Sequence, residues 1–361
     1  VGSLVAVLVM CLLPNASSFG MAVSTAMIFG LVSLMFLDTS INMAMQPFKM
    51  MVGDMVNEKQ KGLAYSIQSF LCNAGSLVGF LFPFIFTWIG ISNIAPQGVV
   101  PDSVIYSFYI GAAILILCVI YTTVKVKEMP PAEYAEYHGI TEEEKKEKIN
   151  MVKLLVKAPK AFWTVGLVQF FCWFAFMFMW TYTNGSVAAN VFDAPTVETV
   201  VNGANKVVLD TKSIQYQNAA DWVGVLFAVQ AIGSVLWAVC IPMFKNRKLI
   251  YSLSLVLGGI GFISTYFVHN QYVLFISFLL IGCAWAAMLA LPFTILTNAL
   301  SGGHMGTYLG LFNGTICIPQ IVAATLGGSI LALFTPKGML PPEINMLVMA
   351  CLLYTSPSPR D

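Results

Sequence analysis

Long apolar runs without charge dominate the chain and alternate with short polar segments. Charge-free stretches extend, for example, from Val1 to Leu37, from Gly62 to Pro101 and from Leu249 to Pro336. A helix that crosses a bilayer needs about 20 apolar residues, so several of these stretches hold more than one span. Uncharged turn residues, such as those at 301–304, divide them. The pattern predicts ten membrane-spanning helices, at residues 1–13, 19–48, 63–89, 104–125, 161–183, 220–244, 249–268, 272–298, 306–334 and from 341 onward.

Composition supports this prediction and excludes other classes of protein. Of the 361 residues 58% are hydrophobic and 10% are charged, and the mean hydropathy is +0.80; a soluble domain has about 25% charged residues. The net charge of +1 is spread over loops, which argues against a nucleic-acid partner. All eight cysteines fall within apolar spans, so we expect neither disulfides nor metal ligands. No nucleophile–base pair or phosphate-binding loop occurs, so the sequence predicts neither an enzyme nor a cofactor.

The basic residues fix an expected orientation in the membrane. If the charged segment 126–160 is cytoplasmic, fourteen basic residues lie inside and only Lys206, Lys212 and Lys337 lie outside. Cytoplasmic loops of membrane proteins carry an excess of Lys and Arg. We therefore expect a multi-pass protein of the plasma membrane, or of the inner membrane if it is bacterial, with this segment in the cytoplasm.

The charged segment also suggests a division of the chain. Residues 126–160 contain Pro130-Pro131 and a run of Glu and Lys, which is typical of a solvated linker between two helical bundles or of a short amphipathic surface helix. Residues 184–219 have mixed polarity, and we expect a plain loop on the outer side. The predicted organisation is the remainder of an N-terminal bundle at 1–125, a cytoplasmic linker at 126–160, a C-terminal bundle at 161–350 and a non-native tail at 351–361, where an apolar span breaks off abruptly.

An internal repeat supports two bundles. Pro47-Phe48, followed by a segment that begins at Gly62, has a counterpart in Pro292-Phe293, followed by a segment that begins at Gly306. The offsets are 245 and 244 positions, so a single gap reconciles them. Parallel repeats of this kind build secondary transporters with two related halves. The fold class that we expect is all-α and integral to the membrane, with two six-helix bundles, of which the first two helices are missing from this sequence.

Polar residues within a span are costly, so their positions indicate function. Asp38, Asn42, Met45 and Lys49 follow i, i+4, i+7, i+11 spacing and share one helix face, with Asp54 near its end. We predict that Asp38, Lys49 and Asp54 couple transport to protons. The alternative is a structural ion pair, which locks helices together or forms a gate.

A second set of polar and aromatic residues predicts a substrate site. Ser69 and Asn73 share a face of the third span, and the repeat relates this face to Asn313 and Gln320 in the ninth. Amide groups beside aromatic faces suit a sugar, which has apolar C–H faces and a polar rim. The alternatives are hydrogen bonds between helices and aromatic packing in lipid. The predicted substrate-binding residues are Asn42, Ser69, Asn73, Gln169, Trp173, Asn313 and Gln320.

Three segments resemble a known family. Residues 38–54, with Asp38, Asn42, Pro47 and Asp54 in place, resemble the fourth-helix signature of the sucrose-proton symporters of plants and their animal and bacterial relatives, within the glycoside-pentoside-hexuronide:cation symporter group. Lys49 stands where the plant proteins have arginine, so the bidentate fork of that side chain is lost. Residues 306–320 are similar to the eleventh-helix motif of the same group, and residues 173–185 are similar to its seventh-helix pattern.

The resemblance implies the major facilitator fold with twelve helices and alternating access. It implies proton-coupled uptake of a sugar, a disaccharide or a glucoside, by a protein that we expect to be a monomer in the lipid bilayer. Two other functions stay open. One is a sodium-coupled sugar symporter of the melibiose type, and the other is a membrane sensor or scaffold that keeps the fold and does not transport.

Overall fold

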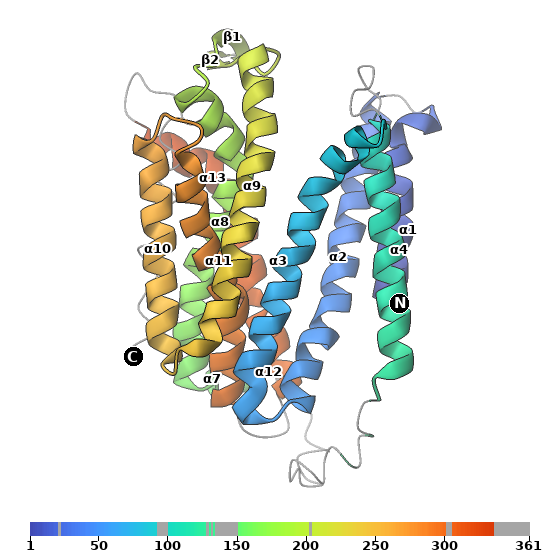
Figure 1. The fold of residues 1–361 in the computed structure, drawn as a ribbon, viewed down its shortest axis with the longest axis vertical. Coiled ribbons are helices and arrows are strands. Elements are labelled where there is room, and N and C mark those ends of the chain that lie inside the picture. The colour runs from blue at the N-terminus through green and yellow to red at the C-terminus, as the bar shows by residue number, and fades with distance from the viewer. Residues whose placement is uncertain are drawn as a thin grey trace. The chain divides into compact units, whose positions relative to one another are not determined.

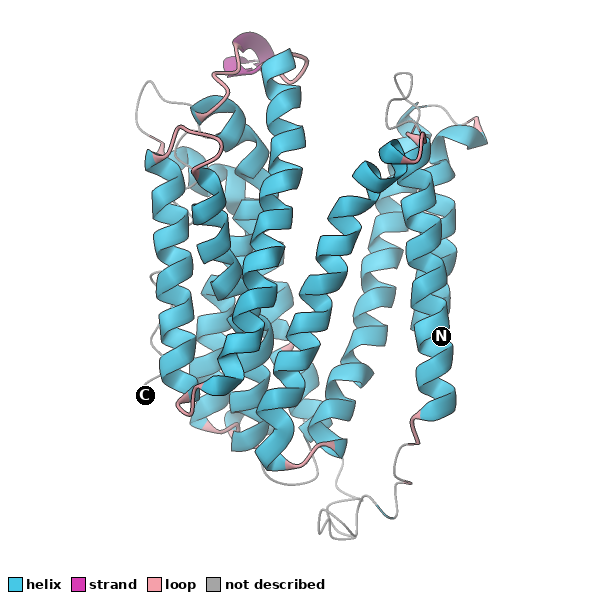
Figure 2. Cartoon of the chain, in the orientation of Figure 1, coloured by secondary structure: helices cyan, strands magenta, loops and turns pink. Residues whose placement is uncertain are grey.

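The structure is a computed structural model in which almost every described residue is helical (Figure 2). It describes residues 1–20, 23–91, 100–127, 130, 133, 151–201, 204–300 and 305–335. The chain divides into two compact units. Unit 1 consists of Val1–Val56 and Val78–Thr141, and unit 2 consists of Asn57–Leu77 and Glu142–Asp361. Each unit is described by itself, and the division falls within one helix, α3.

Unit 1 is built from three helices and the last part of a fourth. The elements are α1 (Gly2–Leu12), η1 (Leu13–Phe19), α2 (Val23–Met55), α3 (Glu58–Trp88) from Val78 onward, and α4 (Asp102–Lys125) (Figure 1). Helix α1 packs against both α2 and α4. Pro14 lies in the first turn of the 3-10 helix η1. Proline has no backbone N–H, and at this position a helix does not need one. Asn15 Nδ2 then donates to Tyr109 Oη at 2.6 Å, which fastens this turn to α4.

Unit 2 is a helical bundle around α11. Its elements are the first part of α3, α7 (Met151–Val156), α8 (Lys160–Asn190), β1 (Thr196–Val201), β2 (Ala204–Leu209), α9 (Ile214–Cys240), η2 (Ile241–Met243), α10 (Arg247–Phe267), α11 (Leu274–Ala299), α12 (Met305–Phe312) and α13 (Gly314–Phe334). Helix α11 packs against α8, α9 and α10, and its middle is almost wholly buried.

Small residues let the helices around α11 approach closely. A Cβ atom on Gly282 of α11 would collide with the Gln230 carbonyl of α9, and one on Gly261 of α10 would lie 2.7 Å from the Ser277 carbonyl. At the same crossing Ser234 Oγ donates to the Gly282 carbonyl at 2.8 Å. Lipid is as apolar as a helix surface, so close packing and hydrogen bonds drive helix association in membranes. These contacts therefore hold α9, α10 and α11 together.

The helices confirm the predicted multi-pass architecture. Seven of the described helices are long and apolar enough to cross a membrane, and a shorter apolar helix covers Gly2–Ala16. Helix α3, with 31 residues, covers the third predicted span. The span predicted from residue 341 onward and the tail at 351–361 lie outside the described residues. Two details differ from the prediction, since α8 continues to Asn190 and the ninth span is interrupted at Asn313 between α12 and α13.

The segment between α8 and α9 contains a β-hairpin, so the prediction of a plain loop was wrong. Strands β1 and β2 are antiparallel, with Thr196 opposite Leu209 and Val201 opposite Ala204. Valine recurs along both strands, threonine occurs twice in β1, and the two residues between the strands are Asn202-Gly203. That dipeptide favours the tight turns that join hairpin strands. The signal was present in the sequence.

Only parts of the predicted linker at 126–160 are described. Within them, α7 lies just before α8, and Tyr308 Oη of α12 donates to the Leu154 carbonyl of α7 at 3.2 Å. Phe162 of α8 packs edge-on against Tyr308 at 6.1 Å between ring centroids. A short helix is therefore fixed to unit 2 next to α12. The predicted bundle and linker boundaries stay predictions.

Candidate functional site

The predicted coupling residues lie along α2 in unit 1. Asn42 Nδ2 donates to the Asp38 carbonyl at 2.9 Å and to Asp38 Oδ1 at 3.3 Å. Because these residues are one helical turn apart, the amide holds the carboxylate in place without another helix. Lys49 lies about three helical turns after Asp38 and is half-buried. The side chain of Asp54 is outside the described part of the structure.

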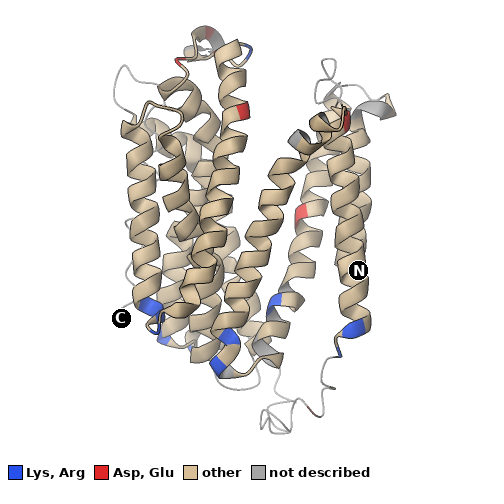
Figure 3. Cartoon of the chain, in the orientation of Figure 1, with Lys and Arg blue, Asp and Glu red and all other residues tan. Residues whose placement is uncertain are grey.

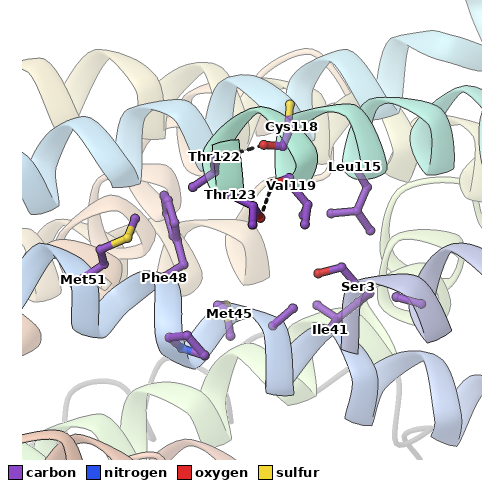
Figure 4. Close-up of a pocket in the computed structure, with 13 residues that line it drawn as sticks. Ser3, Ile41, Met45, Phe48, Met51, Leu115, Cys118, Val119, Thr122 and Thr123 are labelled. Carbon is purple, nitrogen blue, oxygen red and sulfur yellow. Dashed lines mark hydrogen bonds between the residues drawn. The ribbon is translucent and has the colours of Figure 1, made fainter. Parts of the chain in front are cut away.

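Unit 1 also contains a cavity of about 490 Å³ between α1, α2 and α4 (Figure 4). Its lining is mostly apolar and includes Met45, Pro47 and Phe48. The hydroxyl groups of Thr122 and Thr123 donate to carbonyls of their own helix, at 2.9 and 2.7 Å. A sugar needs partners for its hydroxyl groups, so this cavity suits an apolar group better. Asp38 and Asn42 are not among the described residues that line it.

In unit 2 the first part of α3 runs beside α11. Ser69 Oγ donates to the Ala286 carbonyl of α11 at 3.1 Å, and Asn73 Nδ2 donates to the Ser69 carbonyl at 2.7 Å. Both side chains are buried. One turn closer to the start of α3, Tyr65 stacks on Phe293 of α11 with ring centroids 6.1 Å apart. Asn73 Oδ1 is buried and accepts no hydrogen bond from the described residues, so it is a free acceptor beside α11.

Gln169 of α8 is fully buried, and both of its polar ends are occupied. Its Nε2 donates to the Met288 carbonyl of α11 at 3.4 Å, and its Oε1 accepts a hydrogen bond of 3.2 Å from Tyr251 Oη of α10. One side chain thus connects three helices. In this arrangement Gln169 stabilises the bundle, and a contact with substrate would require it to exchange a hydrogen bond. Its predicted role in binding stays a prediction.

Trp173 belongs to an aromatic cluster that joins α8 to α11. Its ring centroid lies 5.5 Å from that of Trp285, at an interplanar angle of 76°. The ring centroids of Trp180 and Phe176 lie 5.3 Å and 5.0 Å from that of Trp285. Trp173 Nε1 is buried without a partner among the described residues. Sequence reasoning missed Trp285; the only signal was a large ring between small neighbours, Ala284 and Ala286.

Asn313 lies at the interruption between α12 and α13. Its backbone N–H still donates to the Leu309 carbonyl at 3.1 Å, whereas the Ile316 N–H donates to the Asn313 carbonyl at 3.0 Å in a tighter turn. Asn313 Oδ1 is buried without a partner among the described residues. A Cβ atom on Gly166 of α8 would lie 3.0 Å from Thr315, so α8 passes close to this break. Gln320, two turns further along α13, is half-buried.

Five of the predicted substrate residues lie in unit 2, on helices that contact α11 or one another. Contacts to residues 285–288 of α11 fix α3 and α8 at this level, and residue 166 of α8 adjoins the break before α13. The five residues are Ser69, Asn73, Gln169, Trp173 and Asn313. Three polar atoms among them lack a partner in the described residues: the acceptors Asn73 Oδ1 and Asn313 Oδ1 and the donor Trp173 Nε1. Asn42 lies in unit 1 and is not part of this group.

This arrangement offers hydrogen bonds and aromatic faces. Helices α8, α10, α11, α12 and α13 contain no acidic residue. The described residues also contain no group of three or more His, Cys, Asp or Glu side chains that could hold a metal ion. A site of this composition suits a neutral polar molecule with an apolar face.

Comparisons with known proteins identify the superfamily and the fold. The profile of the Major Facilitator Superfamily matches residues 1–204. No curated protein matches the sequence. The crystal structure of the Major Facilitator Superfamily transporter FucP in the outward conformation is similar over 99% of this chain and 81% of that chain, with a TM-score of 0.64 and 13% identity. A variant of the E. coli fucose:proton symporter FucP is similar over 99% and 83%, with a TM-score of 0.59 and 15% identity. At such low identity, the two structures establish the fold alone.

Proposed function

Because the chain belongs to the Major Facilitator Superfamily, we propose that it is a secondary active transporter that takes up a sugar, a disaccharide or a glucoside, together with a proton. Alternating access of one site to the two sides of the membrane carries out the transport. The similarity to FucP, described as a fucose:proton symporter, supports a sugar as substrate. The transporter works as a monomer in the bilayer.

The observation that carries this proposal is the group of polar and aromatic residues in unit 2. Asn73 and Asn313 present free carbonyl acceptors, and Trp173 presents a free N–H donor beside an aromatic cluster. A buried polar atom without a partner costs about 1–3 kcal/mol, so such atoms are expected where a ligand binds. A sugar supplies hydroxyl groups that can both donate and accept. That the sugar is a disaccharide or a glucoside is proposed from the family resemblance of residues 38–54.

Asp38 is the group that we propose to carry the proton. It lies within an apolar helix whose candidate span runs from Ser24 to Lys49, and ionisable residues in such spans mark proton and ion pathways. Asn42 holds its carboxylate through a hydrogen bond of 3.3 Å. A carboxylate that binds and releases one proton per cycle is sufficient for coupling. Lys49 and Asp54 complete the proposed set by favouring or opposing its charge.

The orientation follows from the basic residues. In unit 2 they gather where α9 ends and where α8 and α10 begin, and the basic residues there are Lys157, Lys160, Lys245, Arg247 and Lys248 (Figure 3). By the positive-inside rule we place this end, and the linker at 126–160, in the cytoplasm. The membrane is the plasma membrane, or the inner membrane in a bacterium.

The test is uptake of labelled maltose, sucrose and glucose by cells that express the gene, with an imposed proton gradient. We expect accumulation of at least one sugar, which a protonophore abolishes and a sodium gradient does not restore. Accumulation driven by sodium alone would favour the melibiose type of coupling. Binding of a sugar without its uptake would favour a sensor. The absence of both binding and uptake would refute a sugar substrate.

A further inference from the structure

Three indole rings meet where α8 crosses α11. Trp285 of α11 lies edge-on to both tryptophans of α8, with interplanar angles of 76° to Trp173 and 86° to Trp180. The two rings of α8 are themselves 6.1 Å apart. Edge-to-face pairs of this kind are stabilising, so each ring holds the next in a fixed direction.

These rings differ from the aromatic core beside them. Phe174, Phe176 and Phe178 of α8 are buried, as expected for packing residues. Trp180 is 41% exposed, and Trp173 and Trp285 are half-buried. The three indoles therefore keep part of their surface exposed. On another side of the cluster, Phe176 packs against Phe262 of α10, with ring centroids 5.8 Å apart.

The two tryptophans of α8 share one face of that helix with polar groups. Trp173, Met177, Trp180 and Asn184 follow i, i+4, i+7, i+11 spacing, and each is half-buried or exposed. Trp173 Nε1 and Asn184 Oδ1 are buried and have no partner among the described residues. This face thus has aromatic surface along its length, a free donor at Trp173 and a free acceptor at Asn184.

We propose that Trp285, together with Trp173 and Trp180, forms a stacking surface that binds the C–H face of a pyranose ring. Trp173 Nε1 donates a hydrogen bond to a hydroxyl group on the rim of the same ring. Trp285 is then a residue that determines specificity, and the substrate class is a cyclic hexose or its glycoside. The inference rests on the proposed function and makes it more specific.

The chemistry distinguishes a ring from an open chain. A pyranose presents several C–H groups in one plane, and these can lie on an indole while the hydroxyl groups point outward. A hexitol has nearly the same hydroxyl groups and no rigid C–H face, so it gains little from the aromatic surface. The preference for a ring over a chain is therefore expected to depend on Trp285, because that indole holds both tryptophans of α8 in place.

The test measures inhibition of labelled sugar uptake by methyl glucopyranoside and by sorbitol in four proteins: wild type, Trp285→Ala, Trp285→Phe and Trp163→Ala. Trp163 is the matched control, since it is on α8 and 54% exposed but lies outside the cluster. We expect wild type to prefer the glucoside by about tenfold, which corresponds to about 1.4 kcal/mol. Trp285→Ala should weaken inhibition by the glucoside about tenfold and leave that by sorbitol unchanged, and Trp163→Ala should match wild type.

The Phe variant keeps the test decisive if the Ala variant does not reach the membrane. It retains an aromatic ring of smaller area, so inhibition by the glucoside should weaken about threefold and inhibition by sorbitol should not change. The inference is overturned if the glucoside-to-sorbitol ratio is the same in wild type and in every Trp285 variant that reaches the membrane. That result would leave sugar transport intact. If wild type transports no sugar at all, the proposed function fails first, and the inference fails with it.

Discussion

Removing one hydroxyl group, by Tyr251→Phe, tests whether Gln169 holds the bundle together. Tyr251 and Gln169 are both fully buried, and the Tyr251 hydroxyl is the donor to Gln169 Oε1 at 3.2 Å. Phenylalanine keeps the ring and its packing, so the substitution removes only the hydrogen bonds of the hydroxyl group, to Gln169 Oε1 and with the Cys172 thiol. In the variant, the hydrogen bond from Gln169 Nε2 to the Met288 carbonyl remains. Gln169 Oε1 then has no donor among the described residues.

The expected loss of stability lies between two estimates. An unsatisfied buried acceptor costs about 1–3 kcal/mol in soluble proteins. Hydrogen bonds between membrane helices average about 0.6 kcal/mol and reach about 1.7, because the unfolded chain in the membrane also finds partners. Full burial favours the upper part of the second range. We therefore expect Tyr251→Phe to lower the free energy of unfolding by about 1–1.7 kcal/mol.

Reversible unfolding in mixed detergent micelles measures this loss. Tyr272→Phe is the matched control, because Tyr272 is 61% exposed near the start of α11 and should lose little on the same change. Equal unfolding free energies for wild type and Tyr251→Phe would refute the structural role. If the variant instead keeps its stability and raises the KM for the sugar, Gln169 acts on the substrate, as the sequence pattern predicts.

Two further predictions concern packing and orientation. Gly282→Ala should greatly reduce the yield of monodisperse protein in size-exclusion chromatography, because the new Cβ would collide with the Gln230 carbonyl. The control Gly259→Ala should not reduce the yield, because there is open space around Gly259. Equal yields for the two variants would contradict the close crossing of α9 and α11. A cysteine in place of Val197 should react with an impermeant maleimide from outside the cell, and one in place of Glu143 only after permeabilisation; the opposite pattern would reverse the proposed orientation.

The spans were predictable from sequence because each depends on its own residues. An apolar run of sufficient length forms a helix in lipid because a helix satisfies its backbone hydrogen bonds within the run itself. The division of α12 and α13 at Asn313 was not predicted, although a glycine follows that residue. The hairpin was not predicted, although β-branched residues recur along β1 and an Asn-Gly pair lies between the strands.

The candidate site was predictable in its residue types and only partly in its arrangement. Helical spacing correctly grouped Asp38 with Asn42, because that contact lies within one helix. It said nothing about which helices meet. The bond from Ser69 to α11, the burial of Gln169 under Tyr251 and the contact of Trp173 with Trp285 all depend on packing between segments far apart in the chain. Trp285 was missed for this reason.

The measurement that tests the central claim most directly compares wild type with Asp38→Asn in two assays of labelled sugar. Asparagine is nearly isosteric with aspartate and can keep its contact with Asn42, but it cannot bind and release a proton. Sugar accumulation driven by a proton gradient should therefore be lost, while exchange of labelled for unlabelled sugar across the membrane, which needs no net proton movement, should persist. If Asp38→Asn accumulates sugar to the wild-type level with an unchanged dependence on pH, Asp38 does not carry the proton and the proposed coupling is wrong.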